Sequence, residues 1–344
     1  MSDTIYYPLT SPQLSIWYTE RMYPNTSISN VAGTLRIKEA IDLSILEKAI
    51  NCYIKNNDGM RLKICLDEDG NPQQYVSEYV YKKFEFKDFS GFEDPMKAMQ
   101  EWDREEALKP LELLNSDVFR FILIKLDETD VGFFFCFHHI VADAWSLSII
   151  KNGILDLYKK IASEIQNDIN IDKPSYISYI EDELIYKASN RYQKDKEFWE
   201  QRFNSPPEAT VLKTRNNNLV SIKSKRKTFI APKKYSKKLK EYCQENRTTP
   251  YPLFLSALAM YINRTTEKEN LIIGTPILNR LNQSEKNTVG MFISTIPLCI
   301  KVDSRDTFLS FSRKISEECL SSYRHQRFPY EHILKSVREK HGVI

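Results

Sequence analysis

The chain has 344 residues, of which 42% are hydrophobic and 28% are charged, and 49 basic against 46 acidic residues leave a net charge of +3. This length exceeds that of one small domain, and the even charge argues against nucleic acid or an anionic membrane surface as the main partner. The six cysteines form no CxxC pair, no leader-like segment opens the chain, and no apolar run reaches the roughly 20 residues of a membrane helix. We therefore expect a soluble, globular, cytoplasmic protein with free thiols.

The first half of the chain carries four regular patterns. Apolar residues at helical spacing predict a helix over 43–54, capped by Asp42. Residues 118–126 alternate in part, as in a half-buried strand, whereas the aromatic run 132–137 suits a strand that is buried on both faces. Helical spacing returns over 145–161.

A polar stretch from Ser163 to Tyr176 predicts a crossover between two parts of the chain. Beyond it we predict strands at 228–231, 271–274 and 291–302, and helices at 234–245, 252–263 and 308–323. No short-period repeat is present. The pattern therefore predicts two α/β lobes of similar layout, residues 1–170 and 171–344, each with a sheet covered by helices.

Two adjacent histidines, His138 and His139, stand where the aromatic strand ends, and Asp143 follows them. A neutral imidazole can accept a proton or orient a reacting group. Asp143 could pair with an arginine to hold the loop, and Ser146 could cap the next helix. The alternatives are a structural histidine pair or a metal site with Asp143, although no third soft ligand lies nearby. No serine or cysteine nucleophile motif and no phosphate-binding glycine loop is present.

The segment FHHIVADAWS (137–146) resembles the HHxxxDG signature of the condensation-domain superfamily of nonribosomal peptide synthetases. Further blocks of that family are matched in order along almost the whole chain: LTSPQLSIWY (9–18), NNDGMRLKI (56–64), PSYISYIEDELIY (174–186), VGMFISTIPL (289–298) and RHQRFPYEHIL (324–334).

The resemblance implies an α/β fold in which two chloramphenicol-acetyltransferase-like α+β sandwich lobes form a V-shaped pseudodimer with a tunnel between them. It also implies that the second lobe is truncated, because family members continue beyond the last block. Donor and acceptor carrier proteins would enter with their phosphopantetheine arms, and an amine would attack a thioester to form an amide. We expect no cofactor or metal bound by the chain itself, adjacent adenylation and carrier domains, and a monomer.

The resemblance also assigns roles to individual residues. His139 would be the catalytic residue, as a base or as an orienter of the amine. His138 and Asp143 would be structural, with Asp143 paired to Arg61. The remaining expected site residues are Ala144, Trp145 and Ser146 in the signature, and Gln13, Ser294 and Thr295 facing the tunnel or substrate.

Two residues depart from the family pattern, since Ala144 replaces the signature glycine and Ser294 replaces an asparagine. Four alternatives stay open beside amide formation, and the two departures support only the last of them. They are a starter domain with a fatty-acyl donor, an epimerisation domain, an ester-forming acyltransferase, and an inactive module that recruits carrier proteins. The intact histidine signature favours an enzyme.

Overall fold

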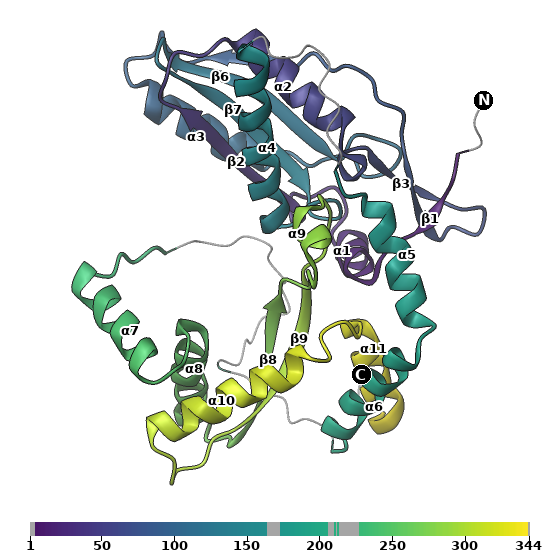
Figure 1. Ribbon diagram of the computed structural model, residues 1–344, viewed down its shortest axis with the longest axis vertical. Helices are drawn as coiled ribbons and strands as arrows, with labels where there is room; N and C mark the ends of the chain where they lie inside the picture. The colour runs from purple at the N-terminus through teal and green to yellow at the C-terminus, as the bar shows by residue number, and fades with distance from the viewer. Residues whose placement is uncertain (1–3, 164–172, 206–209, 211, 213–226, 343–344) are drawn as a thin grey trace. The chain divides into compact units, whose positions relative to one another are not determined.

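The chain divides into two compact units (Figure 1). The computed structural model describes residues 4–163, 173–205, 210, 212 and 227–342. Unit 1 consists of Met1–Ser189 and Leu278–Ile293, and unit 2 consists of Asn190–Ile277 and Ser294–Ile344. The boundary predicted between residues 170 and 171 falls outside the described residues, whereas the contacts place a division after Ser189.

Unit 1 contains two sheets and helices that pack on them. In chain order its elements are β1 (Tyr7–Pro8), α1 (Ser11–Met22), β2 (Asn30–Ile37), α2 (Leu43–Lys55), the 3-10 helix η1 (Asp58–Met60), β3 (Leu62–Leu66), β4 (Pro72–Val76), β5 (Glu85–Asp88), α3 (Pro95–Ala107), β6 (Phe119–Asp127), β7 (Asp130–His138), α4 (Ala144–Ala162), α5 (Tyr176–Lys187) and α9 (Gln283–Asn287).

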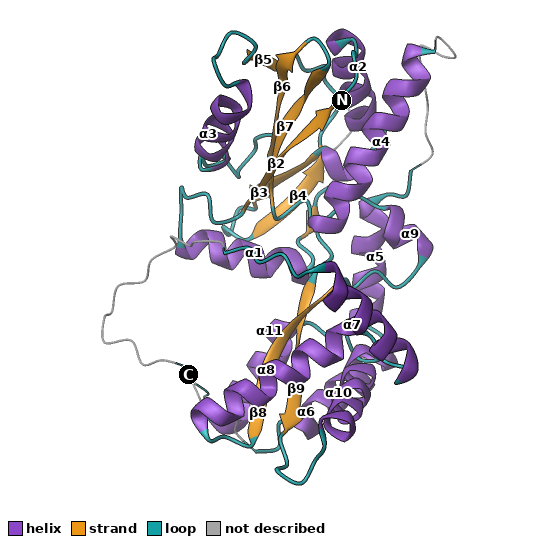
Figure 2. Cartoon of the chain, turned by 90° about the vertical axis from the view of Figure 1, so that its left-hand side faces the viewer, coloured by secondary structure: helices purple, strands orange, loops and turns teal. Residues whose placement is uncertain are grey.

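The larger sheet has the strand order β2-β7-β6-β5. Strand β5 is parallel to β6, and the other pairs are antiparallel. Side chains alternate across a strand, so Phe133 and Phe137 of β7 pack against α2 and α4, while Phe134 lies on the other face with Trp102 of α3. Figure 2 shows α3 on one side of this sheet and α2 and α4 on the other. The aromatic run is therefore buried on both faces, as predicted.

The smaller sheet has the order β1-β4-β3 and lies beside α1. Helix α1 begins with a reciprocal capping box, in which Thr10 accepts from the Gln13 backbone and the Gln13 side chain accepts from the Thr10 backbone. Trp17 of α1 is buried in a core that also contains Tyr176 of α5 and Phe292. This core therefore ties segment 278–293 to the first half of the chain.

Unit 2 is built on one antiparallel pair of strands, β8 and β9. Its elements in chain order are α6 (Asn190–Arg202), α7 (Lys233–Glu245), α8 (Pro250–Thr266), β8 (Asn270–Ile277), β9 (Ser294–Lys301), α10 (Phe308–Tyr323) and α11 (Tyr330–His341). Its core joins Trp199 of α6 and Ala259 of α8 with Ile296 and Leu298 of β9.

The structure confirms most of the elements predicted from sequence periodicity. The helix over 43–54 is α2, and Asp42 accepts from the Ser44 and Ile45 backbones as its cap. The strand predicted at 228–231 is wrong, because these residues have no regular structure and Phe229 and Ile230 are exposed. The strand predicted from residue 291 begins only at Ser294. Within the described residues, no helix combines the length and the apolar character that crossing a membrane requires.

Candidate active site

The two histidines stand at the junction between β7 and α4, and the backbone sends their side chains into different surroundings. His138 is the last residue of β7 and pairs with Asn30 of β2. Its side chain is 2% exposed, whereas that of His139, the next residue, is only half-buried. Asp143 then caps α4 by accepting from the Ser146 backbone at 2.7 Å. Residues 139–143 are thus a short loop held between a strand end and a helix start.

Both ring nitrogens of His138 face protein groups. The Ile140 backbone donates to His138 Nδ1 at 3.2 Å, so Nδ1 is an acceptor and the ring proton lies on Nε2. His138 Nε2 lies 3.4 Å from Glu20 Oε2. Burial raises the pKa of Glu20, but its contacts with His138 and Ser29 outweigh burial and lower this pKa below its usual value. His138 therefore belongs to the framework of the loop.

The imidazole ring of His139 is held by fewer hydrogen bonds than that of His138. Its backbone N–H donates to the Ser29 carbonyl at 2.7 Å, which fixes the main chain. Its Nδ1 is buried, and no hydrogen-bond partner for this atom exists among the described residues. Of the two signature histidines, His139 is the one whose ring solvent reaches, because His138 is buried.

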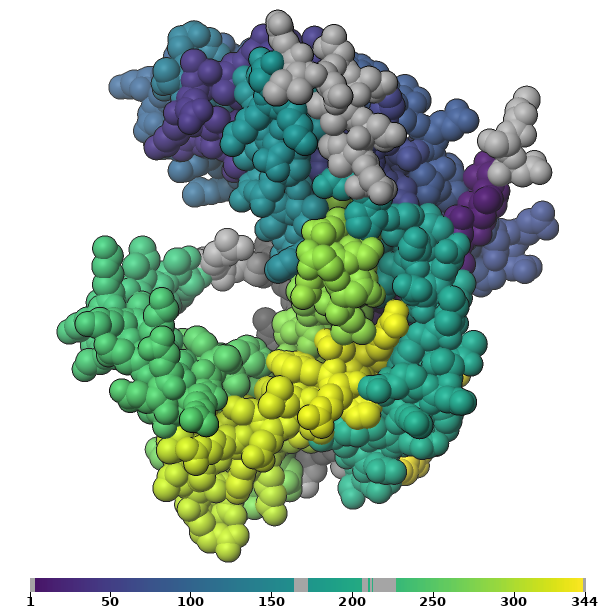
Figure 3. Space-filling view, viewed as in Figure 1, coloured from purple at the N-terminus to yellow at the C-terminus, as the bar shows by residue number. Residues whose placement is uncertain are grey.

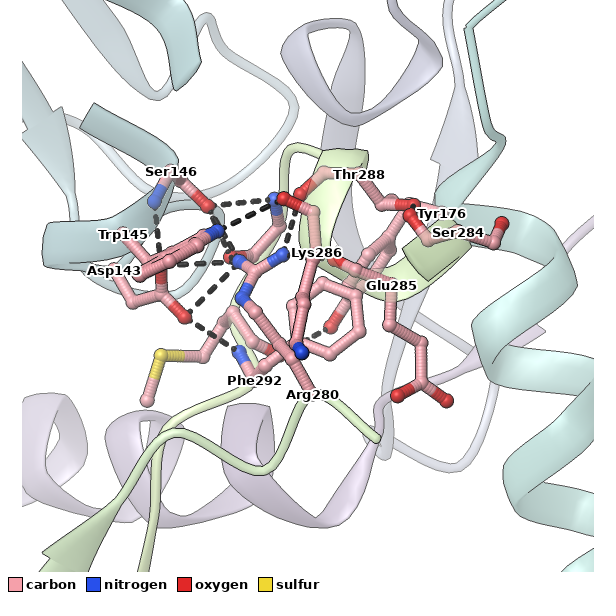
Figure 4. Close-up of polar contacts among 12 residues, drawn as sticks. Asp143, Trp145, Ser146, Tyr176, Arg280, Ser284, Glu285, Lys286, Thr288 and Phe292 are labelled. Atoms are coloured by element: carbon pink, nitrogen blue, oxygen red, sulfur yellow. Dashed lines mark hydrogen bonds and ion pairs between the residues drawn. The ribbon is translucent and has the colours of Figure 1, made fainter. Parts of the chain in front are cut away.

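Asp143 is enclosed and fully engaged (Figure 4). Its two carboxylate oxygens lie 3.1 and 3.2 Å from Arg280 Nη2, and the Phe292 backbone donates to Oδ2 at 3.2 Å. Together with the cap on α4, these contacts leave the carboxylate no free role in chemistry. Asp143 joins the histidine loop to segment 278–293.

Arg280 is 4% exposed, and its guanidinium donates to many acceptors. Besides Asp143, it donates to the Thr288 carbonyl at 2.7 Å, to the Gly290 carbonyl at 3.2 Å, to Ser146 Oγ at 2.9 Å and to the Glu285 carbonyl. Its guanidinium carbon lies 3.8 Å from the centre of the Phe292 ring. Burial lowers the pKa of Arg280 and Asp143 opposes that shift. The guanidinium remains charged because its ordinary pKa lies far above neutrality.

Two predicted contacts of the signature are wrong. Asp143 pairs with Arg280 and not with Arg61, whose Nη1 donates to the Ser77 carbonyl at 2.6 Å instead. Ser146 does not cap α4, because Asp143 already does so. The Ser146 hydroxyl instead donates to the Gly290 carbonyl at 2.7 Å and accepts from the Gly290 backbone at 3.1 Å.

Gln13 does not face substrate, contrary to the prediction, because its side chain is fully buried. Its Nε2 donates to Gln74 Oε1 at 2.8 Å and to the Ile140 carbonyl at 3.1 Å. Gln74 returns a hydrogen bond to Gln13 Oε1 at 2.8 Å. The buried amide pair thus supports the histidine loop from α1 and β4.

The other predicted site residues fall in two places. Ala144 and Trp145 are exposed at the start of α4, and Trp145 Nε1 donates to the Lys286 carbonyl at 2.8 Å. Ala144 is not among the residues with positive φ, so its backbone does not require the glycine of the family signature. Ser294 and Thr295 are half-buried at the start of β9, in unit 2. Their place beside substrate stays a prediction.

Sequence reasoning missed two residues of this site, Glu20 and Arg280. Neither carries a local signal, because Glu20 lies in the charged end of α1 and Arg280 in a polar segment after β8.

Within the described residues, no three His, Cys, Asp or Glu side chains are grouped to hold a metal ion.

Comparison with known proteins identifies the family to which the chain is similar. The family model described as "Condensation domain" matches residues 4–343. The chain is 37% identical over 341 residues to surfactin synthase subunit 1 of Bacillus subtilis (strain 168), covering 98% of the chain and 9% of that protein. It is 37% identical over 335 residues to a plipastatin synthase of the same organism, covering 97% of the chain and 13% of that protein. The chain thus spans only a small part of these curated relatives.

Solved structures resemble the fold. The first condensation domain of the calcium-dependent antibiotic synthetase, in complex with a substrate analogue, matches with a TM-score of 0.84 and 21% identity, over 97% of this chain and 78% of that one. The starter condensation domain of rhizomide synthetase matches with a TM-score of 0.77 and 22% identity, over 96% of this chain and 75% of that one. At these identities the likeness shows that the chain has the same mixed α/β fold. It does not show which substrate the chain uses.

Proposed function

The chain belongs to the condensation-domain family of nonribosomal peptide synthetases, acyltransferases that form amide bonds, and on this premise we propose that His139 serves amide formation between two carrier-bound substrates. The donor is an acyl or peptidyl thioester, and the acceptor is an aminoacyl thioester with a free amine. Phosphopantetheine arms of two carrier proteins deliver both groups, and neighbouring adenylation and carrier domains load them. The chain acts as a monomer, and its cytoplasmic location stays a prediction.

The proposed reaction is a direct transfer. The neutral amine nitrogen attacks the donor carbonyl, the new C–N bond forms, and the C–S bond to the donor arm breaks. One amine proton leaves the nitrogen, and the donor arm departs as a thiol after taking up a proton. His139 assists either as the base that receives the amine proton or as the acceptor that orients the amine. No covalent intermediate on the protein is required.

The observation that carries this proposal is that Asp143 and His138 are buried against other protein groups, whereas His139 is only half-buried. Asp143 is enclosed by Arg280 and two backbone donors, and His138 faces Ile140 and Glu20. His138 Nε2 and His139 Nδ1 are both buried without a hydrogen-bond partner among the described residues, but only the His139 ring is half-buried and so reached by solvent. A group that touches substrate must keep hydrogen-bonding capacity in reserve, whereas groups that hold a loop need not.

We propose that the rest of the site follows the family arrangement. Units 1 and 2 correspond to the two acyltransferase-like lobes, and Ser294 and Thr295 of unit 2 face substrate. Asp143, Arg280 and Ser146 act on the loop and not on the reacting atoms. An ion pair buried to this depth fixes a conformation more than it stabilises the fold.

The test uses this chain with a loaded donor carrier and an aminoacyl-loaded acceptor carrier. Intact-protein mass spectrometry follows the appearance of the donor mass on the acceptor arm. We expect His139→Ala to reduce the transfer rate at least about 100-fold, as loss of a general base does. His341→Ala, at the end of α11 in unit 2, is the matched control and should transfer at the parent rate. His139→Gln, which keeps a hydrogen-bond acceptor without a base, should retain partial activity only if His139 orients the amine.

A panel of donors and acceptors separates the alternatives. Fatty-acyl donors that outpace aminoacyl donors would indicate a starter domain, and a hydroxyacyl acceptor that works alone would indicate ester formation. Inversion at Cα of a single loaded carrier would indicate epimerisation. Folded protein that binds carriers but transfers none of these groups would overturn the catalytic proposal and leave the recruiting module.

A further inference from the structure

Glu20, in the last turn of α1, reaches the histidine loop by two routes. Glu20 Oε2 accepts a hydrogen bond from Ser29 Oγ at 3.0 Å and lies 3.4 Å from His138 Nε2. The side chain of Glu20 is 12% exposed, and His138 and Ser29 are buried. One carboxylate therefore contacts two residues whose other atoms hold the loop.

We propose, building on the function proposed above, that Glu20 is a positioning residue that sets the place of the His139 imidazole without touching substrate.

The first route runs through the ring of His138. His138 Nε2 faces Glu20 Oε2 at 3.4 Å without completing a hydrogen bond, and His138 Nδ1 accepts from the Ile140 backbone at 3.2 Å. The Ile140 carbonyl is held in turn by Gln13 Nε2 at 3.1 Å. Because Ile140 follows His139 directly, the main chain on one side of His139 is held by these contacts.

The second route runs through Ser29. Glu20 holds the Ser29 hydroxyl, and the Ser29 carbonyl accepts the backbone N–H of His139 at 2.7 Å. Glu20 thus supports a residue that binds the main chain of His139 itself. The two routes therefore hold the backbone N–H of His139 and that of the residue after it.

The chemistry of this position favours a carboxylate. Burial raises the pKa of Glu20, but its contacts with His138 and Ser29 lower it by more, so Glu20 is ionised at neutral pH and acts only as an acceptor. This carboxylate accepts a hydrogen bond from Ser29 Oγ at 3.0 Å, and its charge faces His138 Nε2 at the longer distance of 3.4 Å. Removing the carboxylate would leave the buried His138 N–H facing an apolar side chain, which favours rearrangement of the ring.

The experiment compares Glu20→Leu and Glu20→Gln with the parent chain in the carrier-to-carrier transfer assay. We expect Glu20→Leu to lower kcat about 10- to 100-fold, while the KM for the acceptor carrier changes less than about threefold. Glu20→Gln keeps the size and an acceptor oxygen, so it should lose less than Glu20→Leu. The matched control is Glu183→Gln, because Glu183 of α5 also holds α1 by accepting from the Ser11 backbone at 3.0 Å, at the opposite end of that helix from Glu20.

A second readout does not depend on turnover. Selective ¹⁵N labelling of the five histidines reports the tautomer of each ring. We expect the His138 ring of the parent chain and of Glu183→Gln to show a protonated Nε2 and an acceptor Nδ1. In Glu20→Leu its nitrogen shifts should move toward the average of the two tautomers.

The outcomes separate this proposal from the proposed function. A parent chain without transfer would refute the proposed function, and the histidine spectra would still test the contact with Glu20. Transfer that is unchanged in Glu20→Leu, or lost equally in Glu183→Gln, would overturn the positioning role. An unchanged His138 spectrum in folded Glu20→Leu would overturn it as well.

Discussion

Asp143 and Arg280 each have no exposed side-chain surface, yet their surroundings differ. Asp143 receives Arg280 and two backbone N–H groups, from Ser146 and Phe292. Arg280 is also surrounded by carbonyl oxygens that do not depend on Asp143. The two halves of one ion pair therefore differ in how well each tolerates the loss of the other.

Removing the cation should cost more than removing the anion. Arg280→Met leaves a buried carboxylate without its counter-charge, so the free energy of unfolding should fall by about 3 to 5 kcal/mol. Asp143→Asn leaves Arg280 with its carbonyl acceptors, so the loss should be about 1 to 3 kcal/mol. Urea denaturation followed by circular dichroism measures both values, and the double variant should lose less than the sum of the two.

Arg61→Met is the control, because Arg61 is the partner that the family resemblance suggested and it binds Ser77 instead. Its effect on unfolding should add to that of Asp143→Asn within about 0.5 kcal/mol. A larger coupling between Arg61 and Asp143 than between Arg280 and Asp143 would refute the assignment of the pair.

The sequence identified the signature residues of this site but not all their partners. His138, His139 and Asp143 stand together in the chain, so their proximity requires no knowledge of the fold. Arg280 lies 137 positions from Asp143, and no local pattern encodes a contact of that range. Gln13 belongs to a block that resembles the family, but only the packing of α1 on the loop shows that its amide binds the Ile140 carbonyl.

At the scale of elements, helices α2 and α4 meet at a point where there is no room for a methyl group. A Cβ on Gly153 of α4 would lie 2.1 Å from a ring carbon of Tyr53, which is fully buried in α2. Glycine in a helix interior costs about 1 kcal/mol relative to alanine. The close approach of the two helices offsets this cost, because Tyr53 packs directly over the glycine.

We predict that Gly153→Ala destabilises the protein in spite of its better helix propensity. Overpacking typically costs about 1 to 3 kcal/mol, which exceeds the gain in propensity and should lower the thermal midpoint. Gly91→Ala is the matched control, since its Cβ would meet no atom within 4 Å. Combining Gly153→Ala with Tyr53→Leu should recover part of the loss. Equal or higher stability for Gly153→Ala alone would contradict the packing of α2 on α4.

Helices and strands in which apolar residues recur at regular spacing over several turns or residues were predictable, because that spacing also determines which face of the element is buried. The helices over 43–54 and 308–323 and the strand over 132–137 agree with α2, α10 and β7. The strand predicted at 228–231 rested on two apolar residues alone, and the structure leaves both exposed. Residues 291–293 are apolar like β9, but Phe292 is used in the core of unit 1, so the strand starts later.

At the scale of the whole molecule, unit 1 is discontinuous in sequence. Its second segment, Leu278–Ile293, carries Arg280, Gly290 and Phe292, which contact Asp143, Ser146 and Tyr176 of the first. The short helix α9 of this segment lies at the surface beside α5 (Figure 3). No composition change marks such an insertion, so a single boundary in the chain was the natural expectation.

Because the first segment depends on the second, we predict that residues 1–189 alone are less stable than the same residues joined to 278–293 by a flexible Gly/Ser linker. The short fragment leaves Asp143 without Arg280, which by itself removes about 3 to 5 kcal/mol. It also exposes the surface that Phe292 covers on Tyr176 and Tyr179. Urea midpoints of the two fragments measure the difference.

The Arg280→Met variant of the joined fragment shows whether residues 278–293 stabilise the first segment through the ion pair or through apolar burial. If the ion pair accounts for most of the added stability, the urea midpoint of this variant should fall most of the way to that of residues 1–189. If apolar burial dominates, it should stay near the parent joined fragment, while Phe292→Ala, which removes a buried aromatic ring, should cost about 3 to 5 kcal/mol. Equal midpoints for residues 1–189 and the joined fragment would show that the first segment folds without the second. The contacts of Asp143 would then be a consequence of the fold of unit 1 and not a condition for it.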